Sequence, residues 1–330
     1  MKLGILGSGK IVKEVLPVLK KIENIDLVAI AARNEEKLQN LAKEFDIKKY
    51  YLGIDELLQD QDIDTVYLAL PNHLHFDVMD KAIDYGKDII CEKPFTSNFY
   101  ETKQIIEKAQ HKDVMIVEAI SHRFIPNAIE TKKMINDLGE IKIVSFNYSQ
   151  YSSRYDKFKA GNIEPVFSLE ASGGALIDLN LYNVAFAVDT FGLPKDVKYF
   201  ANIEKDIDTS GIVILDYEDF KVSCIGSKDS AAPMVNTIQG TKATIEIPDA
   251  LNSFAEFYVQ VVGEDNKDSY QFNHDDTSRL YYEFVAIEEI LRNRDAKRVD
   301  ELLEQTKNYM DVITRARFYA NIYYPADKIH

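Results

Sequence analysis

Cysteine, glycine and proline are scarce in this chain of 330 residues, and each shortage excludes a class of protein. The two cysteines, Cys91 and Cys224, cannot form a disulfide framework, and neither lies in a Cys-x-x-Cys or His/Cys ligand spacing. The 14 glycines and 9 prolines are too few for a low-complexity or disordered chain. We therefore expect a globular protein of the reducing cytoplasm.

Long apolar runs are absent as well, so the sequence predicts neither a signal peptide nor a membrane span. Basic residues are the minority, because 39 Lys and Arg against 54 Asp and Glu give a net charge of −15. A surface of that sign repels phosphate backbones, which argues against nucleic acid as a partner. Any phosphate that this protein binds has to be held by a local cluster of donors.

Hydrophobic residues are abundant, at 46% of the chain, and at this length they are enough for two domains. In residues 1–119 strands alternate with helices, which predicts a doubly wound parallel sheet. Residues 120–330 form the second domain, although the last helices could pack back on the first. In the first domain we expect strands at Leu3–Leu6, Ile25–Ala32, Thr65–Leu70, Asp88–Cys91 and Val114–Glu118, and helices at His73–Tyr85 and Ser97–Gln110.

A glycine turn follows the first strand, where Gly7-Ser8-Gly9-Lys10-Ile11 leads into a helical pattern that begins at Val12. Backbone amides in such a turn approach a pyrophosphate closely, and the helix N-terminus favours negative charge. Val12 replaces the third small residue of the usual fingerprint. We expect a dinucleotide here, and the alternative is a tight turn without a ligand, because a lone Gly-x-Gly is weak evidence.

The end of the second strand indicates which dinucleotide binds. NAD-binding folds usually place a carboxylate there, whereas this sequence has Ala32-Arg33-Asn34. Arg33 can meet a 2′-phosphate with its planar charged fork, so NADP is favoured over NAD. Glu35 is the residue that could reverse this preference, and the alternative for Arg33 is a surface side chain at the start of a helix.

Two further loops lie where parallel strands end, which is where ligands bind in open sheets. After Leu70 comes Pro71-Asn72-His73-Leu74-His75, whose His-x-His pair has no third ligand of matching spacing, so we expect nicotinamide rather than a metal there. After Cys91 comes Glu92-Lys93-Pro94, where proline pushes Lys93 into extended geometry at the strand terminus. The alternative for Lys93 is a solvated lysine before a turn.

The second domain begins with a helix at Pro126–Leu138 and continues with strands that predict a mostly antiparallel sheet. In Ile141–Gln150, Val144, Phe146 and Tyr148 share one face, and the opposite face is mixed. We expect helices on one face and a second copy of the chain on the other, in a homodimer or homotetramer. The other expected strands are Val197–Glu204, Gly211–Tyr217, Phe220–Ile225, Ala243–Ile247 and Phe257–Val262.

One helix in this half, from Ser172 to a stop at Gly192, carries Asp178 and Tyr182 four residues apart. On an α-helix these two residues share a face, so a carboxylate and a phenol project together from an apolar element. The alternative is a half-buried tyrosine with a polar neighbour, which is common in protein cores.

A set of motifs, in this order and spacing, resembles the Gfo/Idh/MocA oxidoreductases: Gly7-x-Gly9-x-Ile11, Pro71-Asn72-x-x-His75, Cys91-Glu92-Lys93-Pro94, Glu118-Ala119-x-x-x-Arg123-Phe124-x-Pro126, Gly173-Gly174-Ala175-Leu176-x-Asp178 and the segment Gly240–Pro248. The resemblance spans the chain. It implies an α/β protein with an N-terminal Rossmann domain, a C-terminal α+β domain with an open-faced sheet, and a nicotinamide cofactor. The cofactor contacts expected are Gly7, Ser8, Gly9, Lys10, Ile11, Arg33, Leu70, Asn72, His75, Glu92 and Lys93.

Tyr182 stands where many members of this family carry histidine. In this it resembles the branch that contains dimeric dihydrodiol dehydrogenase and glucose-fructose oxidoreductase, which implies NADP and a sugar, polyol or vicinal-diol substrate. Asn180 replaces a glycine of the family pattern, and His122 stands where an aromatic residue is common. Both departures bear on the shape of the substrate site.

We expect hydride transfer between the nicotinamide and a carbinol or carbonyl carbon, with Tyr182 as the acid/base. An ammonium lowers the pKa of a nearby phenol, which is the role expected of Lys93, and Asp178 would orient either side chain. Two other functions within the family stay open. One is a dinucleotide-binding regulator without catalysis, and the other is a glycoside-cleaving enzyme that uses the cofactor transiently.

Overall fold

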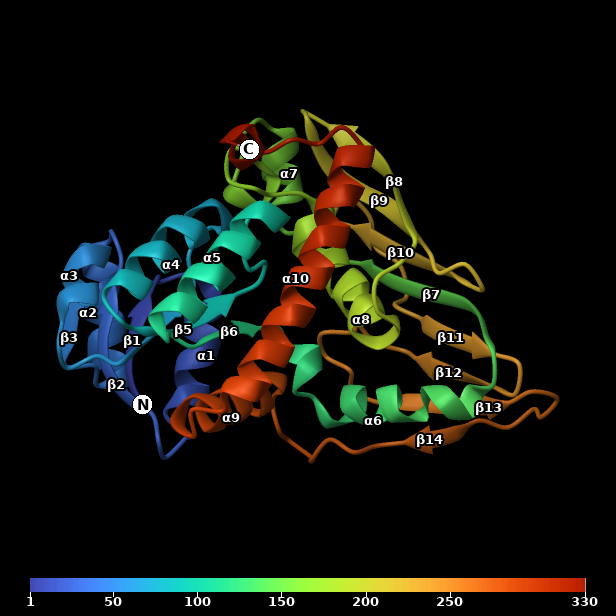
Figure 1. The fold of residues 1–330 in the computed structure, drawn as a ribbon. Coiled ribbons are helices and arrows are strands. Elements are labelled where there is room, and N and C mark those ends of the chain that lie inside the picture. Colours follow the sequence, from blue (N-terminus) through green and yellow to red (C-terminus); the bar gives the residue numbers. More distant parts are fainter. Residues whose placement is uncertain (330) are drawn as a thin grey trace. The chain divides into compact units, whose positions relative to one another are not determined.

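The computed structural model describes residues 1–329 and divides them into two compact units (Figure 1). The first unit comprises Met1–Ala119 and Leu280–Thr306. The second comprises Ile120–Arg279 and the chain from Lys307 onward. A stretch of the C-terminal helices therefore belongs to the first unit. No helix of the described residues is long and apolar enough to cross a lipid bilayer.

A parallel sheet between helices forms the first unit. Its strands are β1 (Lys2–Leu6), β2 (Asp26–Ala31), β3 (Lys49–Tyr51), β4 (Thr65–Leu68), β5 (Asp88–Glu92) and β6 (Ile116–Ala119). Its helices are α1 (Lys10–Leu19), α2 (Glu35–Phe45), α3 (Ile54–Gln59), a 3-10 turn η1 (Asn72–Leu74), α4 (His75–Asp84), α5 (Phe99–Lys112), α9 (Arg279–Arg292, counted from Leu280) and the first part of α10 (Ala296–Tyr319).

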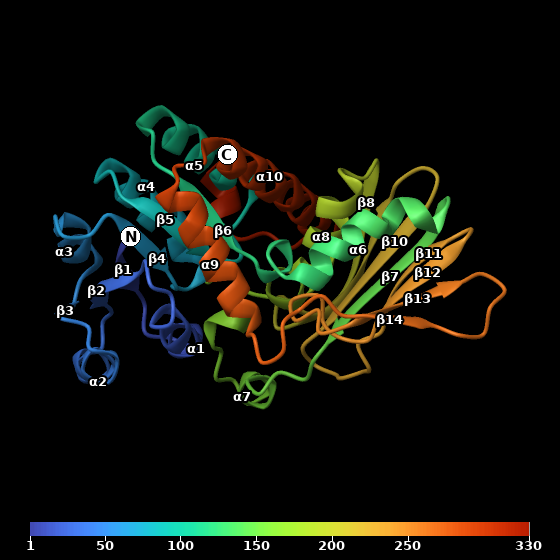
Figure 2. The same cartoon turned by 90° about the horizontal axis from the view of Figure 1, so that it is seen from below.

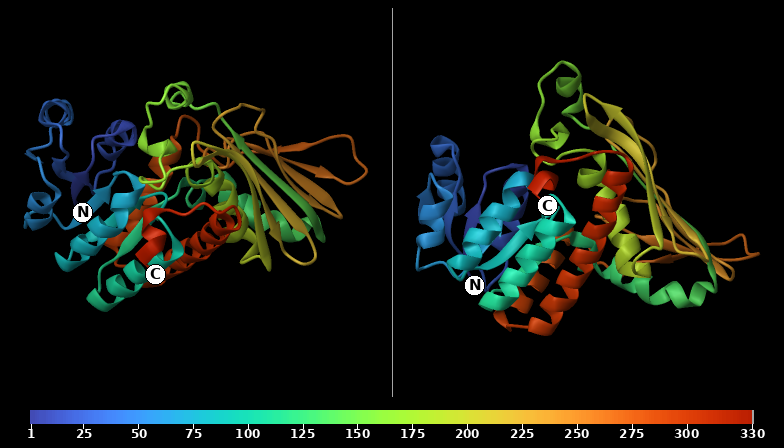
Figure 3. Two further views of the ribbon diagram at one scale, coloured as in Figure 1. Left: turned by 90° about the horizontal axis from the view of Figure 1, so that it is seen from above. Right: turned by 45° about the horizontal axis from the view of Figure 1, so that its top comes forward.

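The order of these strands within the described chain is β3-β2-β1-β4-β5-β6, and every pairing is parallel. Helices α1 and α2 lie on one face and α4 and α5 on the other (Figures 2 and 3). The prediction of a doubly wound sheet is confirmed. It did not include β3, α2 and α3. The strand β3 was missed because an edge strand of three half-exposed residues has no readable periodicity.

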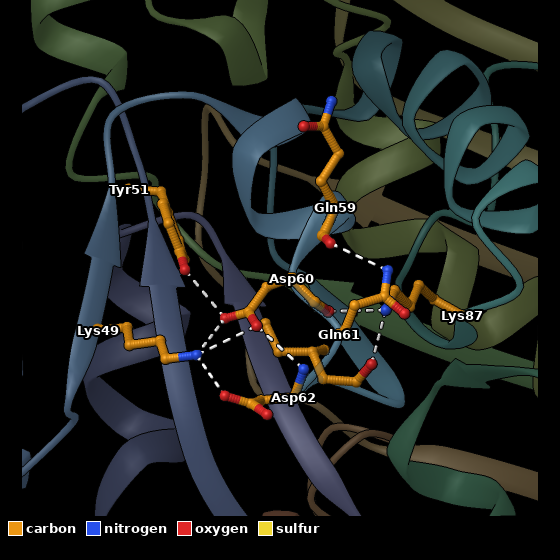
Figure 4. Close-up of polar contacts among 8 residues, drawn as sticks. Lys49, Tyr51, Gln59, Asp60, Gln61, Asp62 and Lys87 are labelled. Atoms are coloured by element: carbon orange, nitrogen blue, oxygen red, sulfur yellow. Dashed lines mark hydrogen bonds and ion pairs between the residues drawn. The ribbon is translucent and has the colours of Figure 1, made fainter.

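A network of ion pairs and of hydrogen bonds to backbone carbonyls fixes the loop that precedes β4 (Figure 4). Lys49 Nζ lies 2.8 Å from Asp60 Oδ2 and 2.6 Å from Asp62 Oδ2, and Tyr51 donates to Asp60 at 2.9 Å. Lys87, only 6% exposed, donates to the carbonyls of Asp60 and Ile63 at 2.9 and 2.7 Å, and burial lowers the pKa of its ammonium. The network lies at the amino end of β4, whereas ligands bind at the carboxyl ends of such strands.

A large, mostly antiparallel sheet forms the second unit, as predicted. Its strands are β7 (Ile141–Ser149), β8 (Asp196–Glu204), β9 (Ile207–Asp216), β10 (Lys221–Ser227), β11 (Asn236–Gly240), β12 (Ala243–Ile247), β13 (Phe257–Val261) and β14 (Asp268–Tyr270). Its helical elements are η2 (Ser121–Arg123), α6 (Pro126–Met134), η3 (Ile135–Leu138), α7 (Tyr155–Lys159), η4 (Pro165–Phe167), η5 (Leu176–Asn180), α8 (Leu181–Phe191), the last part of α10 and η6 (Pro325–Ile329).

The strand order in the second unit is β14-β13-β12-β11-β7-β10-β9-β8, and among the described strands of this sheet only β7 and β10 pair in parallel. Val144, Phe146 and Tyr148 of β7 are buried, as expected, beneath helix α8. Helices α6 and α8 lie on that face of the sheet (Figures 1 and 2). The outer face is apolar near one edge, where Phe200 pairs with Ile212 and Ile212 pairs with Ile225.

Candidate active site

The glycine turn after β1 is built for close approach of a ligand to the backbone. Gly7 has φ +125°, and a Cβ there would lie 2.2 Å from the carbonyl oxygen of Ala69, so only glycine fits. A Cβ at Gly9 would meet no described protein atom within 4 Å. Packing therefore explains Gly7 but does not explain Gly9.

Helix α1 begins at Lys10 directly after this turn, and within the described chain no side chain caps it and no acid lies in its first turn. Unpaired N–H groups at a helix N-terminus attract a phosphate, and a bare Gly9 lets it approach. The residues of this turn, Gly7, Ser8, Gly9, Lys10 and Ile11, thus fit the pyrophosphate of a dinucleotide.

Arg33 is exposed directly after the end of β2. The next residue, Asn34, caps α2 by accepting a hydrogen bond from the Lys37 amide at 2.9 Å, which fixes the backbone beside Arg33. Glu35 accepts a hydrogen bond from Gln39 at 3.3 Å along the same helix. The exposed Arg33 side chain therefore extends from a fixed backbone, and the Glu35 carboxylate is bound by Gln39 of the same helix.

His75 links two loops at the carboxyl ends of the strands. Its ring is fully buried, with Nδ1 2.9 Å from the carbonyl oxygen of Pro94 and Nε2 3.0 Å from that of Leu70. Burial lowers the pKa of His75. The expected contact of His75 with the cofactor stays a prediction. In the structure both ring nitrogens lie against backbone carbonyls, and Leu70 and Asn72 are half-buried in the loop that the ring supports.

Lys93 is half-buried between two anchored neighbours. On one side, Glu92 accepts a hydrogen bond from the buried Tyr67 hydroxyl at 2.7 Å, and burial together with this carboxylate raises the pKa of Tyr67 well above its ordinary value. On the other side, the Lys93-Pro94 peptide is cis and the carbonyl of Pro94 faces His75.

The segment after Pro94 is also fixed, because α5 begins with a capping box. Asn98 accepts from the Glu101 amide at 2.9 Å, and Glu101 accepts from the Ser97 amide at 2.9 Å. The Lys93 backbone is thus held on both sides, and it presents the side chain at the end of β5.

Asp178 and Tyr182 lie in the second unit, but not on one continuous α-helix as expected. Residues Leu176–Asn180 form a π-helical turn, and α8 begins at Leu181. The prediction was wrong here because apolar periodicity does not distinguish a wider turn from an α-helical one, and such turns occur often at functional sites. Tyr182 is only 6% exposed, with its ring 6.1 Å from that of Tyr148.

The π-helical turn is anchored from β9 and from the C-terminal segment. Buried Asp208 accepts hydrogen bonds from the Leu176 amide at 2.6 Å and the Tyr199 hydroxyl at 2.8 Å, and burial raises its pKa to about 6. Gly174 has φ +120°, and a Cβ there would lie 2.1 Å from Asp208 Oδ1. Tyr324 donates to the carbonyl of Gly173 at 2.5 Å. The Gly173-Gly174 pair is therefore required by this packing.

Sequence reasoning missed Lys228, which directly follows β10. Its ammonium lies 2.5 Å from Asp178 Oδ2 and donates to the carbonyl of Val166 at 3.2 Å. It also lies 4.6 Å from the centre of the Phe167 ring. A single lysine at the end of a strand carries no pattern from which this contact could be predicted.

The two departures from the family pattern are buried in the second unit. Asn180 donates to the carbonyl of Cys224 at 2.9 Å, and Gly226 provides its space, since a Cβ there would lie 2.5 Å from that of Asn180. His122 Nε2 lies 2.9 Å from Asp189 Oδ2, and burial lowers the pKa of the imidazole to about 4. In the described residues no group of three His, Cys, Asp or Glu could hold a metal ion.

Comparisons with known proteins show what the chain as a whole is similar to. A model of an oxidoreductase family with an NAD-binding Rossmann fold, named for GFO, IDH and MocA, matches residues 1–119. A scyllo-inositol 2-dehydrogenase (NADP(+)) of Bacillus subtilis is 30% identical over 331 residues, covering 99% of each chain. A trans-1,2-dihydrobenzene-1,2-diol dehydrogenase of Xenopus tropicalis is 31% identical over 256 residues, 75% of each chain.

Among solved structures, a 3-ketoreductase from Actinomadura kijaniata in complex with NADP and TDP-benzene has a TM-score of 0.85 at 18% identity. The match covers 96% of this chain and 97% of that one, and it shows a shared fold. The family expectation drawn from the motifs is confirmed by the full-length relative and by the match to the first domain. The chain belongs to the Gfo/Idh/MocA family and is an oxidoreductase with a nicotinamide dinucleotide cofactor, NADP or NAD.

Proposed function

We propose that this protein transfers a hydride between the nicotinamide cofactor and a CH–OH carbon of a small sugar, polyol or vicinal diol. The observation that carries the proposal is the full-length likeness to a scyllo-inositol 2-dehydrogenase (NADP(+)), whose substrate is a polyol. A trans-dihydrodiol dehydrogenase and a D-xylose 1-dehydrogenase (NADP(+)) among the relatives extend this class to diols and sugars.

The cofactor, when bound, supplies or accepts the hydride at nicotinamide C4. The glycine turn would hold its pyrophosphate, and Arg33 would meet the 2′-phosphate with its guanidinium fork. The loop of Leu70 and Asn72 and the strand end at Glu92 and Lys93 would lie beside the nicotinamide end. His75 would support both loops from beneath, as its two carbonyl contacts suggest.

Tyr182 is the proposed acid/base that moves the proton on or off the substrate oxygen. A free phenol titrates near pKa 10, so work at neutral pH needs a positive charge beside it. We place the Lys93 ammonium in this role. It belongs to the first unit and Tyr182 to the second. Their approach at the substrate oxygen is the core of the proposal, and Asp178 would orient these groups from the preceding turn.

We further propose that a second copy of the chain covers the outer face of the second sheet. Phe200 is 56% exposed and Ile212 is 41% exposed, although they pair across adjacent strands. An exposed apolar strip on a sheet is a typical protein interface. A homodimer or homotetramer formed through this face would bury it.

The glycine turn gives a test of cofactor binding that separates it from folding. Gly9→Ala adds a methyl group that meets no described protein atom within 4 Å, so we expect an unchanged melting temperature and NADPH binding weakened about tenfold or more. Gly7→Ala, the matched control, should lower both quantities, because its Cβ collides with the Ala69 carbonyl. Fluorescence titration with NADPH and thermal melting measure the two effects. Full NADPH affinity in Gly9→Ala would contradict the assignment of the turn.

Arg33 gives a test of cofactor choice. Arg33→Ala removes a charged hydrogen-bond donor to the 2′-phosphate, so kcat/KM with NADPH should fall about 10- to 100-fold. Activity with NADH should stay within a few-fold, since NADH lacks that phosphate. Glu35→Gln is the control, because we expect it to leave the NADPH preference in place. An equal loss with both cofactors would show that Arg33 does not read the phosphate.

Tyr182 and Lys93 give the test of mechanism. Tyr182→Phe and Lys93→Met should each reduce turnover on the order of a hundredfold or more, because general acid/base terms have that size, while NADPH still binds. Tyr148→Phe, a buried tyrosine next to Tyr182, should keep most of the turnover. Wild-type rates in either variant would remove that residue from the mechanism.

Net NADPH consumption with a carbonyl substrate would separate redox catalysis from a regulator and from a glycoside-cleaving enzyme.

The outer sheet face gives the test of assembly. Sedimentation at micromolar concentration should show a dimer or tetramer for the wild-type protein, and Ile212→Asp should shift it to monomer because a charge then lies in the buried strip. Leu52→Asp, at an exposed apolar residue of the first unit, should not change the assembly. A wild-type protein that sediments only as monomer would reject the proposal.

A further inference from the structure

Lys228 is a buried cation next to the residues of the proposed chemistry. Only 1% of its surface is exposed, and its backbone is fixed, because its amide donates to the Thr209 carbonyl at 2.8 Å and its carbonyl accepts from the Ser152 amide at 2.9 Å. A buried ammonium is unfavourable unless it is paired. The stem of Lys228 is thus set by β10, and its charged end is aimed at the turn that holds Asp178.

The contacts of the ammonium are of three kinds. The Asp178 carboxylate accepts at 2.5 Å, the Val166 carbonyl accepts at 3.2 Å, and the Phe167 ring lies beneath the charge at 4.6 Å. A carbonyl and an aromatic face stabilise a cation without cancelling its charge. Among these three groups, the carboxylate of Asp178 is the counter-charge.

The other acids near Lys228 have neutral donors of their own. Asp208 accepts from the Leu176 amide and the Tyr199 hydroxyl. Asp229 accepts from the hydroxyls of Thr209, Ser210 and Ser227 at 2.7 to 2.9 Å. The Lys228 charge lowers the pKa of Asp208 through space, and its ammonium forms an ion pair with Asp178 Oδ2.

We propose that Lys228 is a positioning residue for the proposed reaction, because its ammonium fixes the Asp178 carboxylate and cancels its negative charge next to Tyr182. The inference rests on the proposed function, in which Tyr182 is the acid/base. Asp178 precedes Tyr182 by four residues, about one helical turn. An uncompensated carboxylate at that distance disfavours a phenolate. By pairing with Asp178, Lys228 keeps that carboxylate from opposing the stabilisation of the Tyr182 phenolate by Lys93.

The pH dependence of kcat/KM for substrate oxidation tests this directly. In that direction Tyr182 acts as a base, so the rate rises with pH through the apparent pKa of the tyrosine. Lys228→Met removes the ammonium that pairs with Asp178, which should move the rising limb up by about one pH unit. Asp178→Asn leaves the ammonium uncompensated and should move the limb down. The double variant Asp178→Asn/Lys228→Met carries neither charge, so its limb should return to the wild-type position.

A second readout does not depend on activity. In Lys228→Met the Asp178 carboxylate has lost the ammonium of the Lys228 pair, which stabilises its charged form, so the folded state loses stability where Asp178 is charged. The loss of melting temperature relative to wild type should therefore be large at pH 7 and smaller at pH 4. In the double variant the pH-dependent part of the loss should be smaller, because it then comes from Asp208, whose pKa the Lys228 charge also lowers. Asp208, Asp229 and Tyr199 are present in both variants, so comparing the two isolates Asp178.

Controls make the outcomes distinguishable. Lys87→Met removes a lysine of similar burial in the first unit and should lower stability without moving the pH limb. Lys228→Arg keeps the charge and should leave the limb near its wild-type position. This variant can still be measured if Lys228→Met does not fold. A limb that stays in place in Lys228→Met and in Asp178→Asn would overturn the inference. If the limb instead persists in Tyr182→Phe, the proposed function itself fails.

Discussion

An aromatic hydroxyl can exchange a proton near neutral pH only where positive charge stabilises its anion, and the proposed chemistry of this protein depends on that constraint. Tyr182 is nearly buried, so its local charges are weakly screened by water. Two lysines then have different tasks. Lys93 would supply the stabilising charge, and Lys228 would remove the opposing effect of Asp178, with which it pairs.

Both sets of residues are held by backbone contacts that do not themselves take part in the chemistry. In the first unit, His75 links the carbonyls of Leu70 and Pro94, and Tyr67 holds Glu92. In the second unit, Asp208 and Tyr324 hold the turn at Gly173-Gly174. Within each unit these residues are thus positioned before a ligand arrives, which is a condition for effective acid/base catalysis.

The sequence predicted elements whose patterns are long and regular, and it failed where a single contact decides the structure. The alternation of β1, β2, β4, β5 and β6 with helices and the buried face of β7 follow from periodicity, and both were confirmed. The π-helical turn at Asp178 was not predictable, because it differs from an α-helix by one residue in a turn. Lys228 was missed because it pairs with a residue 50 positions away, and no local pattern indicates such a contact.

The sequence only partly predicted why glycine is required at particular positions. Gly7 and Gly9 were recognised as a pair, but the structure separates them: the packing requires Gly7, whereas no described protein atom lies within 4 Å of a Cβ at Gly9. Gly174 was recognised through the family motif alone, whereas its reason is a carboxylate from β9 that occupies the space of a side chain. A motif identifies such positions, and only the tertiary packing explains them.

The most direct measurement is a crystal structure of the protein with NADP⁺ and a bound polyol. We expect Lys93 Nζ and Tyr182 Oη both to lie within about 3 Å of the substrate oxygen on the carbon that faces the nicotinamide. This expectation would be contradicted if the two side chains lay far apart, or if either pointed to bulk water with the substrate in place.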